Sequence, residues 1–343
     1  MKEKNNIDIS FCLPVYNVAD FIEPCINSIL SQQDGSFSFE ILCINDGSND
    51  NSLKVLENLK TQHSEIFVSS NKTNSGVSYT RNRLIEKAQG KYIWFVDPDD
   101  MLYPDVVSKM FHKIEDLNGN MILGDYIRAN EDALFSTYLK EDKAFEVIPT
   151  NKIRFLPHDT DGMRMTAVWA GLFKRQFLID NHLYFNEGMS VQEDNLFFTQ
   201  LPLKTDFSIK YCGLCYIYRQ RASSVMHHKT LEARIKYYRS IVVMNSVYKE
   251  NLKKGEYKNI NTVKARIHLT NESLILCLAL VPDTKFVKSE LKCLKEKKLY
   301  PYAFRKHALK TEDHLLRRIL VFLLPIEPVF WVLHFSSKIL HKK

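Results

Sequence analysis

Three aspartates within four residues form the densest group of chemically useful side chains in the sequence. Asp97, Asp99 and Asp100 directly follow an apolar run at residues 92–96, which has the length and composition of a buried strand. Carboxylates this close repel one another unless a cation or a basic group neutralises them. Magnesium and manganese prefer oxygen ligands and usually bind one or two carboxylates together with phosphate oxygens. The cluster therefore predicts a divalent-cation site; an exposed turn with helix-capping aspartates is the alternative.

The first hundred residues contain the elements that must position this cluster. Apolar runs of strand length alternate with segments of helical spacing, the runs at 7–13, 39–44, 66–69 and 92–96 and the helical segments at 19–30, 52–62 and 77–88. This order predicts an α/β fold with a mainly parallel sheet, right-handed crossovers and helices on both faces. Ligands of such sheets bind outside the carboxyl ends of the strands, so the residues after each run are candidates for a site.

Polar residues follow the first, second and fourth of these runs. They are Pro14-Val15-Tyr16-Asn17, Asn45-Asp46-Gly47-Ser48 and the cluster that begins at Asp97. Gly47 lets the chain turn sharply, and Ser48 or Asp50 can cap the next helix. Turn chemistry alone explains one such motif, but three at the same edge of a sheet predict a binding site.

The order and spacing of these motifs resemble the inverting glycosyltransferases of family 2, which have the GT-A fold. The likeness covers about the first 105 residues and also includes Asn74 to Ser78, Arg81-Asn82 and Gly90 to Tyr92. The resemblance implies a nucleotide-sugar donor, usually a UDP-sugar, bound by Pro14, Tyr16, Asn17, Asp46, Asn74, Arg81 and Asp97. It also implies a Mn²⁺ or Mg²⁺ ion on Asp97 and Asp99. Pro98 stands where family members commonly have serine, which stiffens the loop without removing a ligand.

Residues 169–175, 185–188 and 193–198 resemble the acceptor side of the same family. An inverting transfer needs one carboxylate to take the proton of the attacking acceptor hydroxyl. The resemblance implies Asp194 in that role, with Glu193 orienting the acceptor or the base; two acids that complement a helix dipole are the alternative. Arg219 lies in a segment that resembles one closing over the donor and is expected to contact phosphate. His227 and His228 are weaker candidates for a metal or phosphate contact.

The charge of the chain is unevenly distributed. The net charge of +7 divides into −7 for residues 1–225 and +14 for residues 226–343. We predict a catalytic domain at 1–225, with a nucleotide-sugar half at 1–105 and an acceptor half at 106–225, followed by a basic helical region at 226–343. The broken apolar runs and basic flanks of 315–343 favour the surface of an anionic membrane. Packing onto the chain's own domain and insertion into the membrane are the alternatives.

The composition limits the other classes of protein to which the chain could belong. With 45% hydrophobic and 25% charged residues in 343, the chain is expected to be globular. Seven scattered cysteines, including Cys212 and Cys215, favour ordinary thiols in a reducing compartment over a disulfide framework or a zinc site. The first residues lack the pattern of a signal peptide. We therefore expect a cytoplasmic protein, peripheral on the inner face of the cell membrane, and no nucleic-acid partner, because no nucleic-acid-binding signature accompanies the basic tail.

Together these features predict a metal-dependent hexosyl- or N-acetylhexosaminyltransferase. Its acceptor would be a hydroxyl of a surface polysaccharide or a lipid-linked glycan. The alternatives are a nucleotidyltransferase, against which the Glu193-Asp194 segment counts, and a non-catalytic nucleotide-sugar-binding scaffold at the membrane, against which the acidic cluster counts.

Overall fold

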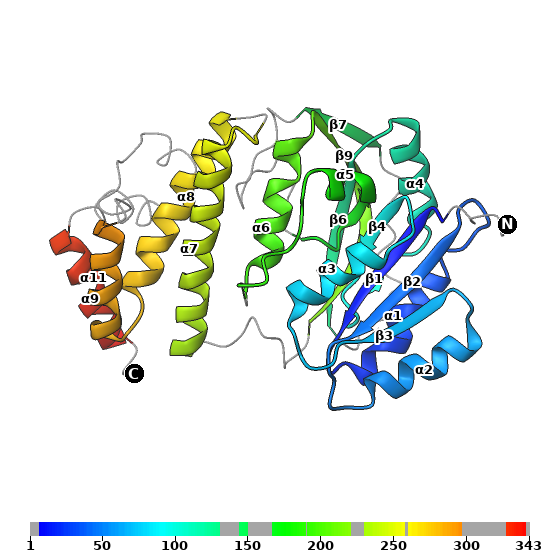
Figure 1. The fold of residues 1–343 in the computed structure, drawn as a ribbon, viewed down its shortest axis with the longest axis horizontal. Helices are drawn as coiled ribbons and strands as arrows, with labels where there is room; N and C mark the ends of the chain where they lie inside the picture. Colours follow the sequence, from blue (N-terminus) through cyan, green and yellow to red (C-terminus); the bar gives the residue numbers. More distant parts are fainter. Residues whose placement is uncertain are drawn as a thin grey trace. The chain divides into compact units, whose positions relative to one another are not determined.

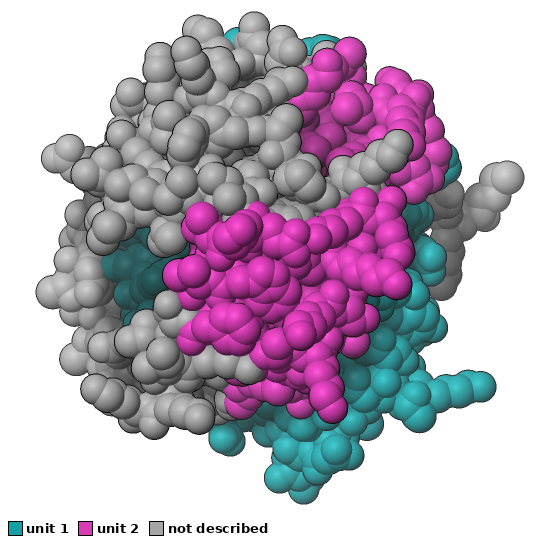
Figure 2. Space-filling model, turned by 90° about the vertical axis from the view of Figure 1, so that its left-hand side faces the viewer, with its two compact units in different colours: residues 1–153, 163–188, 193–224 teal, residues 154–162, 189–192, 225–343 magenta. Residues whose placement is uncertain are grey.

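The structure is a computed structural model that describes residues 7–130, 144–149, 167–189, 191–220, 230–257, 260–296 and 327–340 (Figure 1). The chain divides into two compact units, coloured separately in Figure 2. Unit 1 comprises Met1–Ile153, Met163–Gly188 and Glu193–Ser224, and unit 2 comprises Arg154–Gly162, Met189–Gln192 and Val225–Lys343.

Strands and helices alternate in the first part of unit 1, as the apolar pattern predicts. The elements are β1 (Ile9–Val15), α1 (Ala19–Leu30), β2 (Phe39–Asn45), α2 (Ser52–Gln62), β3 (Ile66–Ser70), α3 (Val77–Lys87) and β4 (Tyr92–Phe95). β1 pairs in parallel with both β2 and β4, and β2 pairs in parallel with β3. The carboxyl ends of these four strands therefore lie at one edge of the sheet, where the polar motifs follow them.

The second part of unit 1 extends the same sheet with strands of both directions. They are β5 (Met101–Leu102), β6 (Met121–Asn130), β7 (Phe145–Pro149), β8 (Gly171–Lys174) and β9 (Phe207–Gln220). The described strands follow the order β3-β2-β1-β4-β8-β6-β9-β5, with β7 also paired to β9. β8 is antiparallel to β4 and β6, whereas β6 and β9 are parallel to each other. The predicted α/β class with a central sheet flanked by helices is confirmed. The sheet as a whole is mixed, parallel from β1 to β4 and with strands of both directions beyond them.

Helices cover both faces of this sheet (Figure 1). Phe11 of β1 lies in the core formed with α1, α2 and α4 (Val107–Asp116). Phe95 of β4 packs edge-on against the rings of Phe185 and Phe197, which stack on each other with centroids 4.0 Å apart. Phe197 belongs to α6 (Glu193–Gln200), so this aromatic packing fixes the helix that begins with the predicted acceptor-side acids. The short α5 (Arg175–Asp180) follows β8.

Unit 2 is helical where it is described. It contains α7 (Leu231–Lys253), α8 (Ile260–Ala279), α9 (Thr284–Glu296) and α11 (Glu327–Leu340). Their buried core includes Tyr238, Leu274, Leu278, Val287 and Phe330. The C-terminal helices expected from the sequence are therefore present, while residues 315–326 of the predicted membrane segment lie outside the described residues. No helix in the described ranges is long and apolar enough to cross a membrane.

Candidate functional site

Asp46, at the end of β2, fixes the loop that leads into α3. Its carboxylate is buried, and Oδ1 accepts hydrogen bonds from Asn71 Nδ2 at 2.6 Å and from Ser75 N at 2.8 Å. Oδ2 accepts a third from Gly76 N at 2.8 Å. Hydrogen bonds to a charged acceptor are stronger than neutral ones, so Asp46 holds the start of α3 firmly at the rim of the sheet.

Gly47 lets this loop approach closely. Its φ of 72° lies in the left-handed region that favours glycine, and a Cβ atom there would lie 2.7 Å from the backbone N of Asn74. The turn after β2 therefore touches the loop that carries Asn74, which is exposed. The structure brings Asp46 and Asn74, both predicted to bind the donor, to the same part of the rim.

The end of β1 is tied to this turn. Asn17 has a positive φ of 51°, its backbone N donates to Ser48 Oγ at 3.1 Å, and its Oδ1 accepts from Asn49 N at 2.8 Å. Pro14 is buried in the strand, whereas Tyr16 is 44% exposed. Of the donor residues predicted at the end of β1, Tyr16 thus presents an exposed aromatic ring, and Asn17 is bonded to the turn that follows β2.

Arg219, near the end of β9, holds the acidic loop in place. Its backbone N donates to Asp100 Oδ1 at 2.8 Å, and its Nε donates to the carbonyl oxygen of Asp99 at 2.5 Å. Its Nη2 donates to the carbonyl oxygen of Phe21 in α1 at 3.1 Å, and the guanidinium lies 5.1 Å from the Phe21 ring centre. Arg219 therefore fastens the loop to the first helix; the predicted contact with phosphate stays a prediction.

Tyr216 also holds the acidic loop in place. Its hydroxyl accepts a hydrogen bond from Asp97 N at 3.0 Å. Asp100 is buried, and among the described residues its Oδ2 has no hydrogen-bond partner. Burial, followed by the negative charges of Asp99 and Asp97, raises the pKa of Asp100 to about 9. The raised pKa shows that Asp100 lies in an excess of negative charge, which a divalent cation bound to this loop would reduce.

The acidic loop offers few carboxylates to a metal. Within the residues that the structure describes, no group of three or more His, Cys, Asp or Glu side chains could hold an ion. Asp97 and Asp99 are both partly exposed at the rim. A pair of carboxylates suits magnesium or manganese when phosphate oxygens and water supply the other ligands, so the residues present fit such an ion.

Arg81 of α3 joins the acidic loop to α6. Its Nη2 lies 2.8 Å from Asp97 Oδ1 and its Nη1 lies 3.1 Å from Glu193 Oε1. The side chain is 5% exposed, and its guanidinium lies 5.2 Å from the ring centre of Phe185. Within the described ranges, its Nε has no hydrogen-bond partner. One buried cation therefore neutralises a carboxylate from each half of the site.

Asn82, the next residue, fastens the predicted acceptor segment to α3. Its Oδ1 accepts from Phe185 N at 2.7 Å, while its Nδ2 donates to the Phe185 carbonyl and to Glu187 Oε1, both at 2.9 Å. All of the polar groups of this amide are therefore engaged by one chain segment. The two neighbouring residues of α3 therefore connect the loop predicted to bind the donor with the segment predicted to bind the acceptor.

Asp194 lies in the first turn of α6, beside Glu193. Its Oδ1 accepts a hydrogen bond from Asn195 N at 2.6 Å. Burial and the negative charge of Glu193 raise the pKa of Asp194 to about 6, while the positive charge of Arg81 opposes them. A carboxylate with this pKa is ionised at neutral pH and accepts a proton more readily than an ordinary aspartate, as a general base must.

An aromatic stack links the acceptor segment to the acidic loop. The ring of Trp169 stacks on Tyr216, with centroids 4.4 Å apart and planes inclined by 18°. The Nε1 of Trp94 in β4 donates to the Trp169 carbonyl at 2.8 Å. Because Tyr216 also bonds the backbone of Asp97, the stack couples the position of residue 169 to that of the loop.

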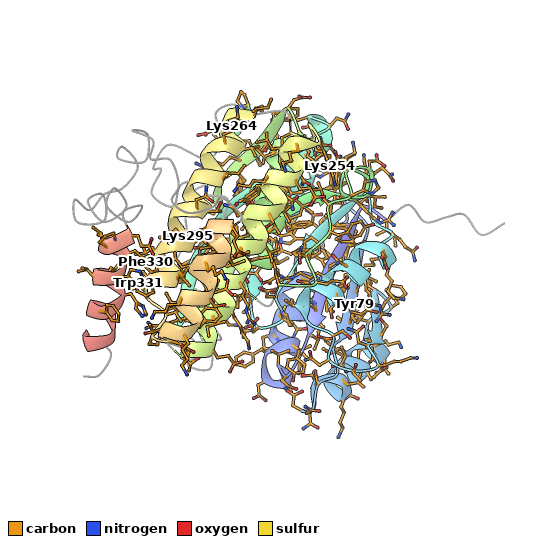
Figure 3. The ribbon with its side chains drawn as sticks, turned by 60° about the vertical axis from the view of Figure 1, so that its left-hand side comes forward. Tyr79, Lys254, Lys264, Lys295, Phe330 and Trp331 are labelled. Atoms are coloured by element: carbon orange, nitrogen blue, oxygen red, sulfur yellow. The ribbon has the colours of Figure 1, made fainter. Side chains whose placement is uncertain are left out.

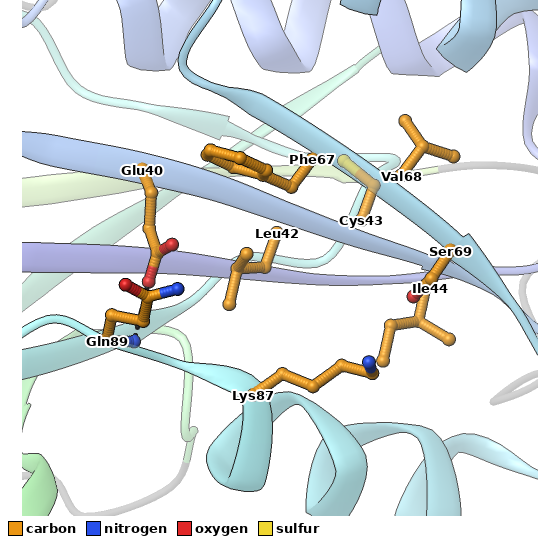
Figure 4. A pocket seen from close by; sticks show the side chains of 9 residues that line it. All are labelled: Glu40, Leu42, Cys43, Ile44, Phe67, Val68, Ser69, Lys87 and Gln89. Atoms are coloured by element: carbon orange, nitrogen blue, oxygen red, sulfur yellow. Dashed lines mark hydrogen bonds between the residues drawn. The ribbon is translucent and has the colours of Figure 1, made fainter.

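A separate cavity of about 230 Å³ lies along β2 (Figure 4). Its lining residues are Glu40, Leu42, Cys43, Ile44, Phe67, Val68, Ser69, Lys87 and Gln89. Glu40, at one end, is held by Ser10 Oγ at 2.5 Å and by Gln89 N at 2.7 Å. None of the residues assigned to donor, metal or acceptor lines this cavity, so we do not include it in the candidate site.

Sequence analysis missed Asn71. Its Nδ2 donates to Asp46 and also to Thr80 Oγ1 at 2.9 Å, so it braces the Asp46 loop against α3. Asn71 directly follows β3, and applying the strand-end rule to the third strand as well would have found it. His227 and His228 lie outside the described residues.

Comparisons with known proteins identify the family to which this fold is similar. Residues 10–177 match the sequence model of glycosyl transferase family 2. The Escherichia coli K12 protein named uncharacterized glycosyltransferase YibD is 29% identical over 197 residues, which are 54% of this chain and 54% of that protein. The poly(ribitol-phosphate) beta-glucosyltransferase of Bacillus spizizenii is 29% identical over 57% of this chain and 30% of its own length. The chain thus spans about half of the first relative and less than a third of the second.

A solved structure shows a similar fold. Residues 1–349 of Staphylococcus aureus TarS in complex with UDP-GlcNAc superpose with a TM-score of 0.66 at 17% identity, covering 98% of this chain and 92% of that one. At this identity the likeness concerns the fold. Family match, relatives and fold agree: residues 10–177 belong to glycosyl transferase family 2, and the chain has the GT-A fold.

Proposed function

We propose that the chain is an inverting glycosyltransferase that moves one sugar from a UDP-sugar to a hydroxyl group of a glycan. The observation that carries this proposal is the pairing of Arg81 with both Asp97 and Glu193. It sets the acids at the start of α6 beside the loop proposed to hold the donor diphosphate. A nucleophile activated by Asp194 would therefore meet the donor at close range.

Asp194 is proposed as the general base. Inversion requires that the acceptor oxygen attack the anomeric carbon from the side opposite the departing nucleoside diphosphate, while a carboxylate takes the hydroxyl proton. The raised pKa of Asp194 suits it to that step. Glu193 is held by Arg81 and is proposed to orient the acceptor or the base. A second catalytic carboxylate, as in a glycosidase, is not required, because a diphosphate is a good leaving group.

Asp97 and Asp99 are proposed to hold a Mn²⁺ or Mg²⁺ ion. Such an ion, when bound, stabilises negative charge on the departing diphosphate. The support is the pair of partly exposed carboxylates at the rim, together with the adjacent Asp100, whose buried Oδ2 has no hydrogen-bond partner among the described residues. Arg219 keeps the backbone of this loop in position.

The proposed donor is supported by the rim residues and by a solved neighbour, and the proposed acceptor is supported by the name of a relative. The exposed Tyr16, together with Asn17, Asp46 and Asn74, forms the rim proposed to bind uridine, and the neighbour TarS was solved with UDP-GlcNAc. A hexosyl or an N-acetylhexosaminyl group is the proposed sugar. The acceptor is proposed to be a surface polysaccharide or a lipid-linked glycan; a relative is named as a glucosyltransferase acting on poly(ribitol-phosphate).

The site of action is proposed to be the inner face of the cell membrane, to which the chain attaches peripherally. The support is the charge of +14 carried by residues 226–343. A polyanionic or lipid-linked acceptor would be presented at such a surface.

Release of UDP from a panel of UDP-sugars tests the transferase proposal. With an acceptor glycan and Mn²⁺, we expect turnover of at least one donor and a product whose anomeric configuration, read by NMR, is inverted relative to the donor. Asp194→Asn should lose turnover while still binding UDP, and Asp116→Asn, an exposed carboxylate at the end of α4, is the matched control. UDP binding without turnover of any donor would favour the scaffold alternative, and pyrophosphate release from a nucleoside triphosphate would favour a nucleotidyltransferase.

A further inference from the structure

The helix α11 carries apolar side chains on both sides. On one side, Phe330 is fully buried, and His334 is buried with Nδ1 3.1 Å from the Ala279 carbonyl. On the other side, Val332 is 66% and Phe335 is 51% exposed. A surface helix normally presents polar residues to water, so this outer face is suited to a non-aqueous surface.

The helix α9 carries a row of exposed lysines. Lys285, Lys288 and Lys292 recur at helical spacing, while Val287 and Leu291 between them are buried. Within the described part of the chain, none of these three lysines forms an ion pair. Their side chains are exposed, and the described residues leave their positive charge uncompensated. We refer to these three residues as the lysine row.

The lysine row lies beside α11, the helix that carries the outer apolar face. Lys295 Nζ lies 2.6 Å from Glu327 Oε2, and Thr284 Oγ1 lies 3.0 Å from His334 Nε2. The end of α9 therefore lies beside the start of α11, and the start of α9 lies beside His334, further along α11. The two helices are thus antiparallel neighbours. Figure 3 shows them side by side, with Lys295 on one and Phe330 and Trp331 on the other. Lys288 and Lys292 each lie one helical turn from a residue that contacts α11, and the row therefore borders that helix.

We propose that the lysine row and the outer face of α11 together bind the surface of an anionic lipid bilayer. Val332 and Phe335 enter the boundary between head groups and acyl chains, and the lysines contact lipid phosphates. The occupant is an anionic bilayer because exposed apolar side chains lie beside uncompensated positive charge, in a region of net charge +14. This inference names the surface responsible for the proposed membrane attachment and rests on that part of the proposed function.

Vesicle flotation with the full chain tests the proposal. We expect binding to vesicles of phosphatidylglycerol and phosphatidylcholine in equal parts, and none to phosphatidylcholine alone. Lys288→Gln with Lys292→Gln should weaken binding by about 30-fold at low salt, since each lysine near an anionic surface contributes about 1 kcal/mol. Val332→Ser with Phe335→Ser should weaken it by about tenfold or more, and high salt should not restore it.

A matched control separates vesicle binding by this surface from non-specific binding by exposed charged and apolar side chains elsewhere. Leu53→Ser with Lys54→Gln removes an exposed apolar side chain and an exposed lysine from α2 in unit 1, and should bind vesicles as the unaltered chain does. Stabilisation by UDP, measured in parallel, should be the same in all variants. Equal binding of the α9, α11 and control variants, or unaltered-chain binding that does not depend on anionic lipid, would overturn the proposal. Vesicle binding that persists in a chain that UDP does not stabilise would refute the donor assignment alone.

Discussion

Arg81 Nη1 lies 3.1 Å from Glu193 Oε1, although 111 residues separate the two in the sequence. The same guanidinium holds Asp97 at 2.8 Å. A single buried arginine thereby sets the distance between the loop proposed to bind the metal diphosphate and the helix that carries the proposed base. Because a guanidinium is planar with fixed donor directions, it also sets their relative orientation.

Replacing Arg81 should cost both stability and activity. In Arg81→Ala, Asp97 and Glu193 lose their common cation while they remain largely enclosed, and removing one partner of a buried ion pair costs about 3–5 kcal/mol. Arg81→Lys keeps the charge but cannot reach both carboxylates at once, so it should recover much of the stability and little of the activity. Chemical denaturation and kcat/KM measure the two effects. Equal activity of Arg81→Lys and the unaltered chain would argue against an orienting role.

The rate of transfer should fall at acidic pH. The pKa of Asp194 is raised to about 6, so the base is ionised above pH 6 and becomes protonated below it. We expect kcat/KM to be level above about pH 7 and to fall about tenfold for each pH unit below the pKa. Asp194→Asn should lower kcat by about 10²–10⁴-fold and abolish this acidic limb. A pH profile that is unchanged in that variant would show that another group is the base.

Arg219 is expected to act as a positioning residue. Its Nε, Nη2 and backbone N hold Asp99, Phe21 and Asp100, so its loss should loosen the acidic loop. Arg219→Lys should raise KM for the donor by about 10- to 100-fold, the equivalent of losing one or two charged hydrogen bonds, with a smaller change in kcat. Steady-state kinetics separates the two parameters. A change confined to kcat would instead place Arg219 at the reacting groups.

Two glycines provide a matched pair for the rim of the site. Gly47 and Gly35 both have positive φ, but a Cβ at Gly47 would lie 2.7 Å from Asn74 N, whereas a Cβ at Gly35 meets nothing within 4 Å. Gly35→Ala should cost about 1 kcal/mol from backbone strain alone. Gly47→Ala should cost about 2–4 kcal/mol, because the clash adds to the strain, and should also weaken UDP binding. Equal losses of stability in the two variants would contradict this close contact.

The first half of the fold follows closely from local sequence pattern. The helical segments predicted at 19–30 and 52–62 have the same bounds in the structure, because apolar spacing and turn residues act over a few neighbours. The later strands depend on distant partners. β6 pairs with β9 some ninety residues further along, and a pairing of that range leaves no local signal.

The residues of the candidate site divide in the same way, into those visible in the local sequence and those defined by distant contacts. Asp97, Asp99 and Asp194 are found from residue type and motif, since carboxylates at strand ends and helix starts are visible in the sequence. Arg81 and Arg219 are also predicted, as donor contacts, but the bonds by which they tie the site together are not visible in the sequence. Glu193 is 112 positions from Arg81, and Asp99 is 120 positions from Arg219. Asn71 falls between the two cases, as its place after a strand is visible but its bond to Asp46 is not.

The most direct test of the central claim is a thermal-shift measurement of UDP with and without Mn²⁺. A ligand that binds only the folded chain raises the Tm by mass action. At a ligand concentration a hundred times Kd, the free energy of unfolding rises by about 2.7 kcal/mol. We expect stabilisation by UDP that is strong with Mn²⁺ and weak without it in the unaltered chain and in Asp194→Asn. In Asp99→Asn this stabilisation should be lost. If no nucleoside diphosphate stabilises the chain with either Mn²⁺ or Mg²⁺, the assignment of a metal-dependent UDP-sugar transferase is contradicted.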